Sequence, residues 1–216
     1  MRKVAVISDV HAFAGELVLV LEQIDEAKID DVFCLGDFAS GGPYPLACYE
    51  MITRRCSLVL AGNHERMIVE KFWEHSTSEY ARWARMASRE LGDERVLAIA
   101  SLPSRVDGKH MQLCHASLRD PVWDFISSAK DAKAQFPLMS SGSLLFGHTH
   151  APALWGRDEH SEARRIPISK KWQTLPRQAL LNPGAVSGSN GLRWMEIELD
   201  DNNRPARVRW HRAKHR

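Results

Sequence analysis

The sequence predicts an α/β fold built around a parallel sheet. Its first 61 residues alternate short apolar runs with stretches of helical spacing, in the order strand, helix, strand, helix, strand. After Pro103 the pattern changes to a hairpin and closing strands. With 216 residues and 44% apolar content, the chain can bury one substantial core, so a single domain covering 1–216 is expected.

The first five elements follow from apolar periodicity and from turn residues. Residues 4–7 are a continuous apolar run, which is typical of a buried strand. Residues 16–28 carry apolar side chains at helical spacing, as in a helix that covers a sheet. Residues 31–35 form the second strand, and a helix over 45–54 has proline in its first turn. The third strand covers 56–61.

Residues 66–102 are predicted to be helical. Their aromatic side chains, which include Trp73, Tyr80 and Trp83, are interpreted as packing groups. A base-stacking platform is the alternative, and it is disfavoured because no basic stripe accompanies them.

The second half of the chain predicts mainly strands. A glycine turn at 108 predicts a hairpin. The hairpin strands, a short helix and four further strands are expected at 104–107, 109–114, 129–136, 144–146, 179–181, 192–199 and 206–210. The charged segment 155–172 is expected on the surface, and the basic end at 211–216 is expected to be a flexible solvated tail.

Composition disfavours several classes of protein. A net charge of +2 gives no reason to expect nucleic acid or a membrane as partner. Neither a membrane span nor a signal peptide is recognisable. The four cysteines form no C-x-x-C pair, which fits reduced thiols. A cytoplasmic location is therefore expected.

Polar groups suited to metal binding follow several of the predicted strands, where open α/β sheets bind their ligands. Asp9 and His11, two residues apart on an extended backbone, face the same way. The complete set is Asp9, His11, Asp37, Asn63, His64, His115, His148 and His150. Two carboxylates, one amide oxygen and four imidazoles are about the ligand set for two adjacent divalent ions, and one imidazole is left for proton transfer.

Some of these motifs have a simpler interpretation when taken alone. The segment Gly62-Asn63-His64-Glu65 could be a turn with a capping asparagine, and Asp9 could cap a helix. The two histidines of Gly147-His148-Thr149-His150 are harder to explain by packing. A metal site is favoured because separate segments supply matching groups.

These motifs resemble the calcineurin-like metallophosphoesterase superfamily. Its pattern D-x-H, G-D, G-N-H-[ED], H and G-H-x-H recurs in order at 9–11, 36–37, 62–65, 115 and 147–150. The resemblance spans residues 4–186, and Asn182-Pro183-Gly184 looks like the N-P-G-S-V signature of prokaryotic members. It implies a four-layer αββα sandwich of two mixed β-sheets flanked by helices.

The resemblance also implies how the ligands divide between two metal ions. One ion would be held by Asp9, His11, Asp37 and His150. The other would be held by Asp37, Asn63, His115 and His148, with Asp37 as the bridge. His64 would act near the leaving oxygen as acid or orienting group, so His64, Asn63 and Asp37 are the expected catalytic residues. Mixed oxygen and nitrogen ligation suits manganese, the first expectation, or iron, nickel or zinc.

One departure from the motifs of the superfamily indicates which subfamily the chain resembles. Protein phosphatases of this superfamily carry G-D-x-x-D-R-G, whose second aspartate supports the catalytic histidine, whereas this chain has Ser40-Gly41-Gly42 there. The loops at 36–45 and 115–123 look like those of small bacterial predicted phosphodiesterases. After Gly184 the chain departs from that pattern, with Ala-Val-Ser-Gly in place of S-V-G-Q, in a loop that could carry substrate contacts.

Two basic features could bind substrate phosphates. Arg119 is a candidate clamp, together with His64, because a guanidinium binds two oxygens at once. The alternative is a salt bridge with Asp120 or another carboxylate. The cations of 155–172 could meet further phosphates if that segment covers the site, and a solvated surface is the alternative.

We therefore expect a metal-dependent phosphoester hydrolase, in which a hydroxide that bridges the two metals attacks phosphorus in line. A phosphodiesterase acting on a small or nucleotide-like substrate is favoured, because the missing aspartate weakens support for a strongly basic leaving group. The alternatives are a dinucleoside tetraphosphate hydrolase and a phosphomonoesterase or protein phosphatase. A non-catalytic interaction scaffold is disfavoured, because every ligand position is kept. The oligomeric state stays open.

Overall fold

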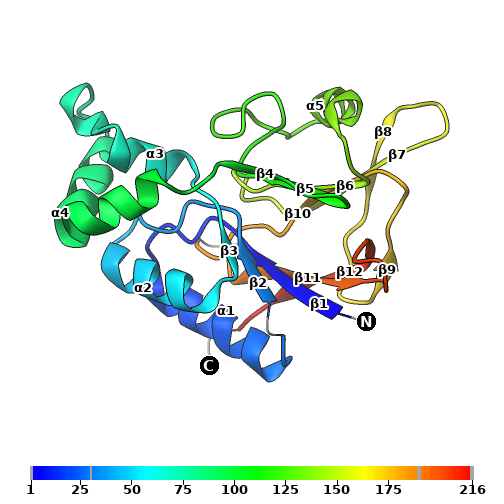
Figure 1. Ribbon diagram of the computed structural model, residues 1–216, viewed down its shortest axis with the longest axis horizontal. Helices are drawn as coiled ribbons and strands as arrows, with labels where there is room; N and C mark the ends of the chain where they lie inside the picture. The colour runs from blue at the N-terminus through cyan, green and yellow to red at the C-terminus, as the bar shows by residue number, and fades with distance from the viewer. Residues whose placement is uncertain (1, 30, 189–190, 215–216) are drawn as a thin grey trace.

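The computed structural model describes residues 2–29, 31–188 and 191–214. Its described strands form two sheets that lie face to face (Figure 1). The first sheet contains β1 (Arg2–Ile7), β2 (Asp31–Cys34), β3 (Leu58–Val59), β9 (Gln173–Thr174), β11 (Arg193–Leu199) and β12 (Pro205–Arg212). The second contains β4 (Arg105–Asp107), β5 (Met111–Cys114), β6 (Ser143–Leu145), β7 (Ala153–Arg157), β8 (Ala163–Ile166) and β10 (Ala179–Asn182).

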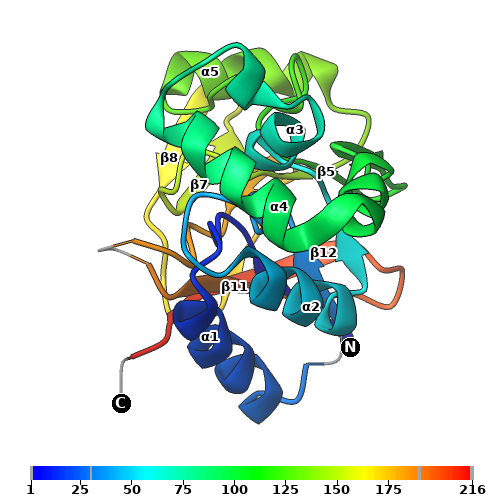
Figure 2. The ribbon, with the colours of Figure 1, turned by 90° about the vertical axis from the view of Figure 1, so that its left-hand side faces the viewer.

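Helices cover the outer sides of both sheets and one end of the sandwich. They are α1 (Ala14–Glu26), α2 (Pro45–Arg55), α3 (Asn63–Val69), α4 (Glu79–Ala100) and α5 (Ala129–Gln135), with 3-10 turns at η1 (Phe72–Glu74) and η2 (Phe136–Leu138). In Figure 1, α1 and α2 lie below the first sheet and α5 lies above the second. Figure 2 looks at the end that α3 and α4 cover. The predicted four-layer sandwich of two mixed sheets is confirmed.

Strand direction brings the predicted site residues to one end of the sandwich. In the first sheet, β1, β2 and β3 are parallel neighbours, in the order β3-β2-β1-β11-β12-β9. In the second, β5, β6 and β10 are parallel neighbours, in the order β4-β5-β6-β10-β7-β8. The two sheets are joined at their carboxyl ends, because the N–H groups of Val186 and Ser187 donate to the carbonyls of Ser8 and Asp9.

Apolar layers hold the sheets and helices together. Buried side chains of both sheets, such as Val6, Leu145 and Ile197, form the layer between the sheets. On the outer side of the first sheet, α1 buries a stripe at helical spacing, made of Leu17, Val20, Leu21 and Ile24. Fully burying one such side chain stabilises the fold by roughly 1.5–3 kcal/mol, so these layers fix the strand ends that carry the site.

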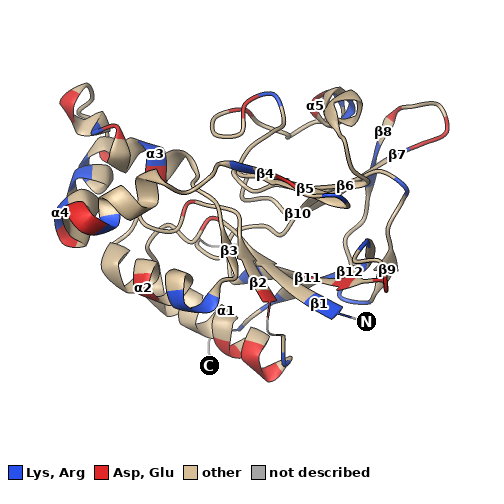
Figure 3. Ribbon diagram, viewed as in Figure 1, with Lys and Arg blue, Asp and Glu red and all other residues tan. Residues whose placement is uncertain are grey.

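The long helical segment differs from its prediction in two ways. It begins at Asn63, three residues before the expected start, and it divides into α3, η1 and α4. Ser78 caps α4 by accepting a hydrogen bond from the N–H of Ala81. Gly92 interrupts α4 with a φ of 73°, a conformation that glycine adopts at little cost. α4 carries both acidic and basic residues, so neither sign dominates along the helix (Figure 3).

The charged segments differ from expectation in different ways. Segment 155–172 lies at the surface as expected, since none of its described residues from 157 to 172 is buried, but part of it is regular structure. Within 155–172, β7 and β8 form an antiparallel pair, in which Trp155 lies opposite Arg165. The supposed tail at 211–216 begins inside β12, and His211 stacks on Trp194 with ring centroids 3.9 Å apart. Tertiary contacts therefore order residues 211–213, which the charge pattern assigns to solvent. Residues 215 and 216 lie outside the described part of the chain.

Helices long and apolar enough to cross a lipid bilayer are absent from the described ranges. Three of the four cysteines are buried, Cys56 is half-buried, and all four thiols are free.

Candidate metal centre

All eight predicted site residues lie at the joined carboxyl ends of the strands. Asp9 and His11 follow β1, Asp37 follows β2, and Asn63 and His64 form the first turn of α3. His115 follows β5, and His148 and His150 follow β6. Their ligand atoms fall into overlapping groups in which all atoms lie within 4.8 Å of one another. These groups are Asp9, His11 and His150; Asp37, His115 and His148; and His11, Asp37 and His64.

The backbone at five of these residues is left-handed. Asp9, His11, Asp37, His148 and His150 have φ angles between 49° and 61°. A non-glycine residue in this region costs on the order of 1 kcal/mol or more, and such strain gathers at functional sites. The surrounding sandwich holds these five conformations, and their side chains converge as a result.

In the first group, which is Asp9, His11 and His150, ligand nitrogen and oxygen atoms lie close together with too few protons to form a hydrogen bond at every contact. The Nε2 atoms of His11 and His150 are 2.9 Å apart, and His150 Nε2 is 3.5 Å from Asp9 Oδ1. Asp9 Oδ2 is buried and has no hydrogen-bond partner within the described part of the chain. Burial lowers the pKa of His11 to about 4, so its ring is neutral at pH 7, the form that binds metal.

The second group is arranged around the buried ring of His115. His115 Nδ1 lies 2.9 Å from the carbonyl oxygen of Leu35 and must donate to it, because a carbonyl only accepts. Its Nε2 then faces Asn63 Oδ1 at 3.1 Å and Asp37 Oδ2 at 3.3 Å. Burial opposes the charged ring, but Asp37 outweighs it and raises the pKa of His115 to about 9. A metal ion would take the place of that proton.

The second group also contains a polar atom without a hydrogen-bond partner among the described residues. His148 Nε2 is buried, and no described residue offers it a hydrogen bond. Burial and the neighbouring His115 lower the pKa of His148 to about 4, so its ring is neutral at pH 7 and has a lone pair on one nitrogen. A neutral imidazole beside a carboxylate and an amide oxygen fits a divalent transition metal. Both groups therefore fit the ions that the sequence predicts.

Glu65 is the residue whose role the sequence prediction missed. Its buried carboxylate accepts the backbone N–H groups of Asp37 at 2.7 Å and of Phe38, Ala39 and Gly62 at 2.9 Å each. Burial and Asp37 raise the pKa of Glu65 to about 7, although hydrogen bonds from Ala39 and Gly62 oppose the shift. The signal was present, because Glu65 is the third residue of α3, where a carboxylate reaches back to the helix start.

The glycines of the G-D and G-N-H motifs are required by close approach. A Cβ on Gly62 would lie 2.2 Å from Asp37 Oδ1, and a Cβ on Gly36 would lie 2.6 Å from the nitrogen of Gly62. Gly36 also has a φ of +109°. The carboxylate of Asp37 can therefore sit beside α3 only because both positions lack a side chain.

His64 stands beside the first group. Its backbone N–H donates to Asp37 Oδ1 at 2.9 Å, and its ring meets that of His11 edge-on at 4.4 Å. Burial lowers the pKa of His64. Its Nδ1 is buried without a partner among the described residues, as is the hydroxyl of Ser40, which stands where protein phosphatases carry the supporting aspartate.

A cavity of about 640 Å³ opens over these groups. Six of the eight residues line it, namely His11, Asp37, Asn63, His64, His148 and His150. Its other walls are largely aromatic, with Phe13, Tyr80, Trp83, Trp123 and Phe125. The packing interpretation is wrong for Tyr80, whose side chain is 59% exposed and faces the cavity, and Trp83 lines the cavity too. Trp73 packs against the core as expected.

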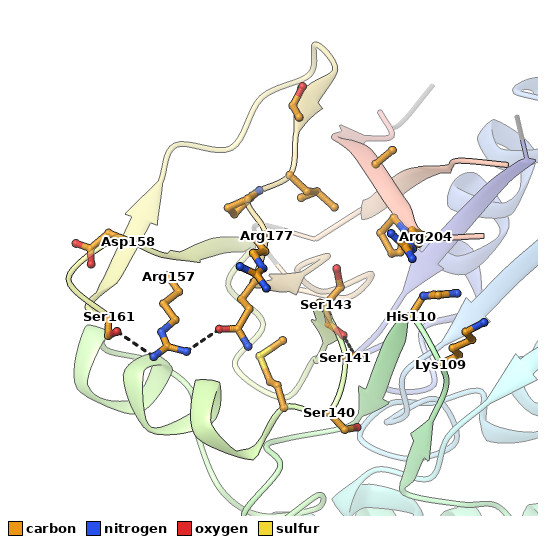
Figure 4. Close-up of a pocket in the computed structure, with 18 of the residues that line it drawn as sticks. Lys109, His110, Ser140, Ser141, Ser143, Arg157, Asp158, Ser161, Arg177 and Arg204 are labelled. Carbon is orange, nitrogen blue, oxygen red and sulfur yellow. Dashed lines mark hydrogen bonds between the residues drawn. The ribbon is translucent and has the colours of Figure 1, made fainter. Parts of the chain in front are cut away.

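The two basic features lie away from this cavity. Arg119 forms an ion pair with Asp124 at 2.8 Å, as the salt-bridge alternative to a phosphate clamp predicts. It does not line the cavity. Segment 155–172 contributes instead to a second cavity of about 1130 Å³ (Figure 4). There Arg157 donates to Gln178 and Ser161. The two cavities share no lining residue.

Comparison with known proteins identifies a family and a fold. The model of the family described as calcineurin-like phosphoesterase matches residues 2–165. An uncharacterized protein from Methanocaldococcus jannaschii is 28% identical over 197 residues, which cover 85% of this chain and 75% of that protein. The crystal structure of a metallophosphoesterase from Sphaerobacter thermophilus is similar over the whole chain and 89% of its own, with 27% identity and a TM-score of 0.82. A hypothetical protein from Pyrococcus horikoshii has the same coverage, 16% identity and a TM-score of 0.77.

Proposed function

This chain belongs to the calcineurin-like phosphoesterase family, and we propose that within this family of metal-dependent phosphoesterases it is a phosphodiesterase acting on small or nucleotide-like substrates. The observation that carries the proposal is the set of three overlapping ligand groups, two of which contain Asp37, beneath one cavity. Phosphate diesters resist attack because their oxygens are negative, and paired cations overcome this repulsion.

The chain's residues would hold two divalent ions, with manganese as the first candidate and iron, nickel or zinc as alternatives. The first ion would be held by Asp9, His11, Asp37 and His150, and the second by Asp37, Asn63, His115 and His148. When bound, the ions would screen the phosphoryl oxygens and lower the pKa of a water molecule near them. Leu35 supports the assignment, because its carbonyl fixes His115 with Nε2 towards the site.

His64 is the proposed proton donor or orienting group for the leaving oxygen. Its N–H contact with Asp37 fixes the start of α3, so the imidazole stands at the cavity wall beside His11. A carboxylate partner for its Nδ1 is missing from the described chain, so the protonated ring lacks the support found in protein phosphatases. Diesters with moderate leaving groups need less of that support than phosphoserine does.

A substrate panel tests the diester preference. With Mn²⁺ at neutral pH, we expect kcat/KM on bis-p-nitrophenyl phosphate to exceed that on a phosphoserine peptide by about tenfold or more. The activated p-nitrophenyl phosphate serves as the monoester control, because it shares the leaving group of the diester. A clear preference for the phosphopeptide would refute the proposal.

We also propose that the chain is one domain in a reducing compartment. Support for a single domain comes from the first sheet, where β1 pairs with both β2 and β11 and so joins the two halves of the sequence. The four free cysteines, of which Cys34, Cys48 and Cys114 are buried, support a compartment without disulfide formation.

A further inference from the structure

Exposed aromatic side chains gather at one place on this protein. Four are exposed in the described part of the chain, and three of them line the metal-centre cavity. These are Tyr80, Trp123 and Phe125, with exposed fractions of 59%, 43% and 51%. Single exposed apolar side chains are common, but a group of them around a concave site marks a surface that a ligand covers.

The three rings reach the metal centre from two elements. Tyr80 lies in the first turn of α4, and its ring meets that of His64 edge-on with centroids 5.8 Å apart. Phe125 lies in the loop before α5, and its ring is 4.2 Å from that of His148 at an angle of 33°. Tyr80 therefore adjoins a histidine beside the first ligand group, and Phe125 adjoins one of the second.

Both elements are held in place by hydrogen bonds of their own. The Ser78 cap fixes the start of α4, and Trp83 Nε1 donates to Glu79. In the loop, Asp124 accepts from the Ser117 hydroxyl at 2.7 Å and pairs with Arg119. Arg119 thus acts as a positioning residue for the loop that carries Trp123 and Phe125. Walls fixed in this way can accept a flat group at little cost in ordering.

The charged residues of the cavity lining indicate which class of ligand the cavity suits. Lys and Arg are absent from its described lining, and Glu79 adds a carboxylate to the wall. Beyond the metal centre, the walls therefore offer little to a chain of extra phosphates and much to a neutral flat ring. A cavity of about 640 Å³ is also within the usual range for a small organic ligand.

We infer that Tyr80, Trp123 and Phe125 form a stacking site for the nucleobase of the substrate, so that the enzyme acts on a nucleotide-like phosphodiester with few further phosphates. This inference rests on the proposed phosphodiesterase activity. Stacking on an aromatic side chain tolerates any base, because every base has a flat face, and substitution of one such side chain commonly weakens binding about tenfold or more.

The kinetic test uses two esters that share a leaving group. Thymidine 5′-(p-nitrophenyl phosphate) carries a base, and methyl p-nitrophenyl phosphate does not. We expect the double variant Tyr80→Ala/Phe125→Ala to raise KM for the thymidine ester at least about tenfold with kcat changed less than about threefold. KM for the methyl ester should change less than about twofold. Equal effects on both esters, or no effect on either, would overturn the inference.

Matched variants separate a loss of stacking from a general loss of folding or activity. Tyr44 is exposed to a similar extent, at 56%, but does not line the cavity, so Tyr44→Ala should behave like the wild type. Tyr80→Phe/Phe125→Tyr keeps both rings and should retain the wild-type KM. A melting temperature within a few degrees of the wild type shows that each variant is folded.

A binding measurement separates this inference from the proposed activity. Adenosine monophosphate titrated into metal-free protein should quench tryptophan fluorescence, because Trp83 and Trp123 line the cavity. The double alanine variant should bind it at least about tenfold more weakly. If neither ester is hydrolysed but this difference in binding is found, the phosphodiesterase proposal fails and the stacking site stands. Equal affinity of wild type and variant overturns the stacking site whatever the activity.

Discussion

At the scale of single residues, the site is defined by what its polar atoms lack. Asp9 Oδ2 and His148 Nε2 are buried without a partner among the described residues, and His115 points a nitrogen at two oxygens. A buried polar group left unpaired costs about 1–3 kcal/mol, so such groups in one place call for a cation. Asp37 and His11 each belong to two of the three ligand groups, and Asp37 has the stronger claim to a shared ligand because its carboxylate offers one oxygen to each of two ions.

Asp37→Asn should therefore remove both metal ions. The amide keeps the shape of the carboxylate but loses its charge, and each ligand group loses its negative bridge. Metal analysis of protein purified without chelator should give about two ions per chain for the wild type and fewer than about 0.5 for Asp37→Asn. His11→Ala is the matched comparison and should retain about one ion. An Asp37→Asn protein with the full metal content would show that Asp37 is not the bridge.

The sequence could predict these residues because each follows an apolar strand, and strand ends meet at the edge of a sheet. It could not predict their backbone, since the left-handed φ angles of Asp9 and His148 depend on contacts with the opposite sheet. It also left the partner of Arg119 open. That partner, Asp124, is set by the path of a loop and not by any periodic pattern.

At the scale of elements, α3 organises the site more than any single strand does. Its first residue supplies the Asn63 oxygen, its second supplies His64, and its third supplies the Glu65 carboxylate that gathers four N–H groups. The predicted start at 66 was too late, because a glycine cap gives no side-chain signal and the motif residues resemble a turn. Three roles thus depend on one short helix.

Glu65→Gln should destabilise the protein and weaken metal binding together. A glutamine side chain has one acceptor oxygen, so two of the four N–H groups that Glu65 binds lose their partner, at a cost of about 1–3 kcal/mol each. We expect a fall in melting temperature of about 5 °C or more and at least tenfold weaker metal binding.

Thermal denaturation and metal titration check the Glu65 prediction. Glu94→Gln changes an exposed carboxylate on α4 and should leave both quantities unchanged. If Glu65→Gln lowered the melting temperature but retained the wild-type metal affinity, the loop would be structural only.

At the scale of the whole molecule, a buried charge ties three strands of the first sheet together. Glu196 on β11 pairs with Lys3 of β1 at 3.1 Å, and with Arg209 and His211 of β12 at 2.6 and 2.9 Å. Burial would raise the pKa of Glu196, but hydrogen bonds from these partners outweigh it and lower the pKa to about 2. The ionised carboxylate is therefore favoured in the fold.

This pairing should make the fold sensitive to acid. Because the folded pKa of about 2 lies below the ordinary 4.5, the stabilisation is full above about pH 4.5 and is lost as the pH falls towards 2. Glu196→Gln should lower the free energy of unfolding by up to roughly 3 kcal/mol at pH 7, and the difference should vanish near pH 2. Urea unfolding at several pH values measures it, and a difference that did not depend on pH would refute this account.

The layers of the sandwich could be predicted from the alternation of strands and helices together with the family resemblance. The prediction failed where tertiary contacts decide. His211 belongs to a strand because its ring stacks on Trp194 and pairs with Glu196. β8 carries charged residues because it is the edge strand of the second sheet, where Arg164 and Arg165 are both exposed. The aromatic lining of the cavity was missed for the same reason, since Tyr80 and Phe125 come to line one cavity only in the folded chain.

The pairing of β1 with β11 has a consequence for synthesis. Val4 at the start of the chain lies opposite Ile197 near its end. The central strand β1 therefore cannot pair with β11 until almost the whole sequence has been made. Contacts of such high sequence separation form slowly, and a chain emerging from the ribosome exposes an unpaired apolar edge meanwhile. The carbonyl of Asp9 is likewise bonded only once Ser187 has been made. A nascent chain that ends just before Ser187 would hold every proposed ligand of the centre and still lack a contact that joins the two sheets there.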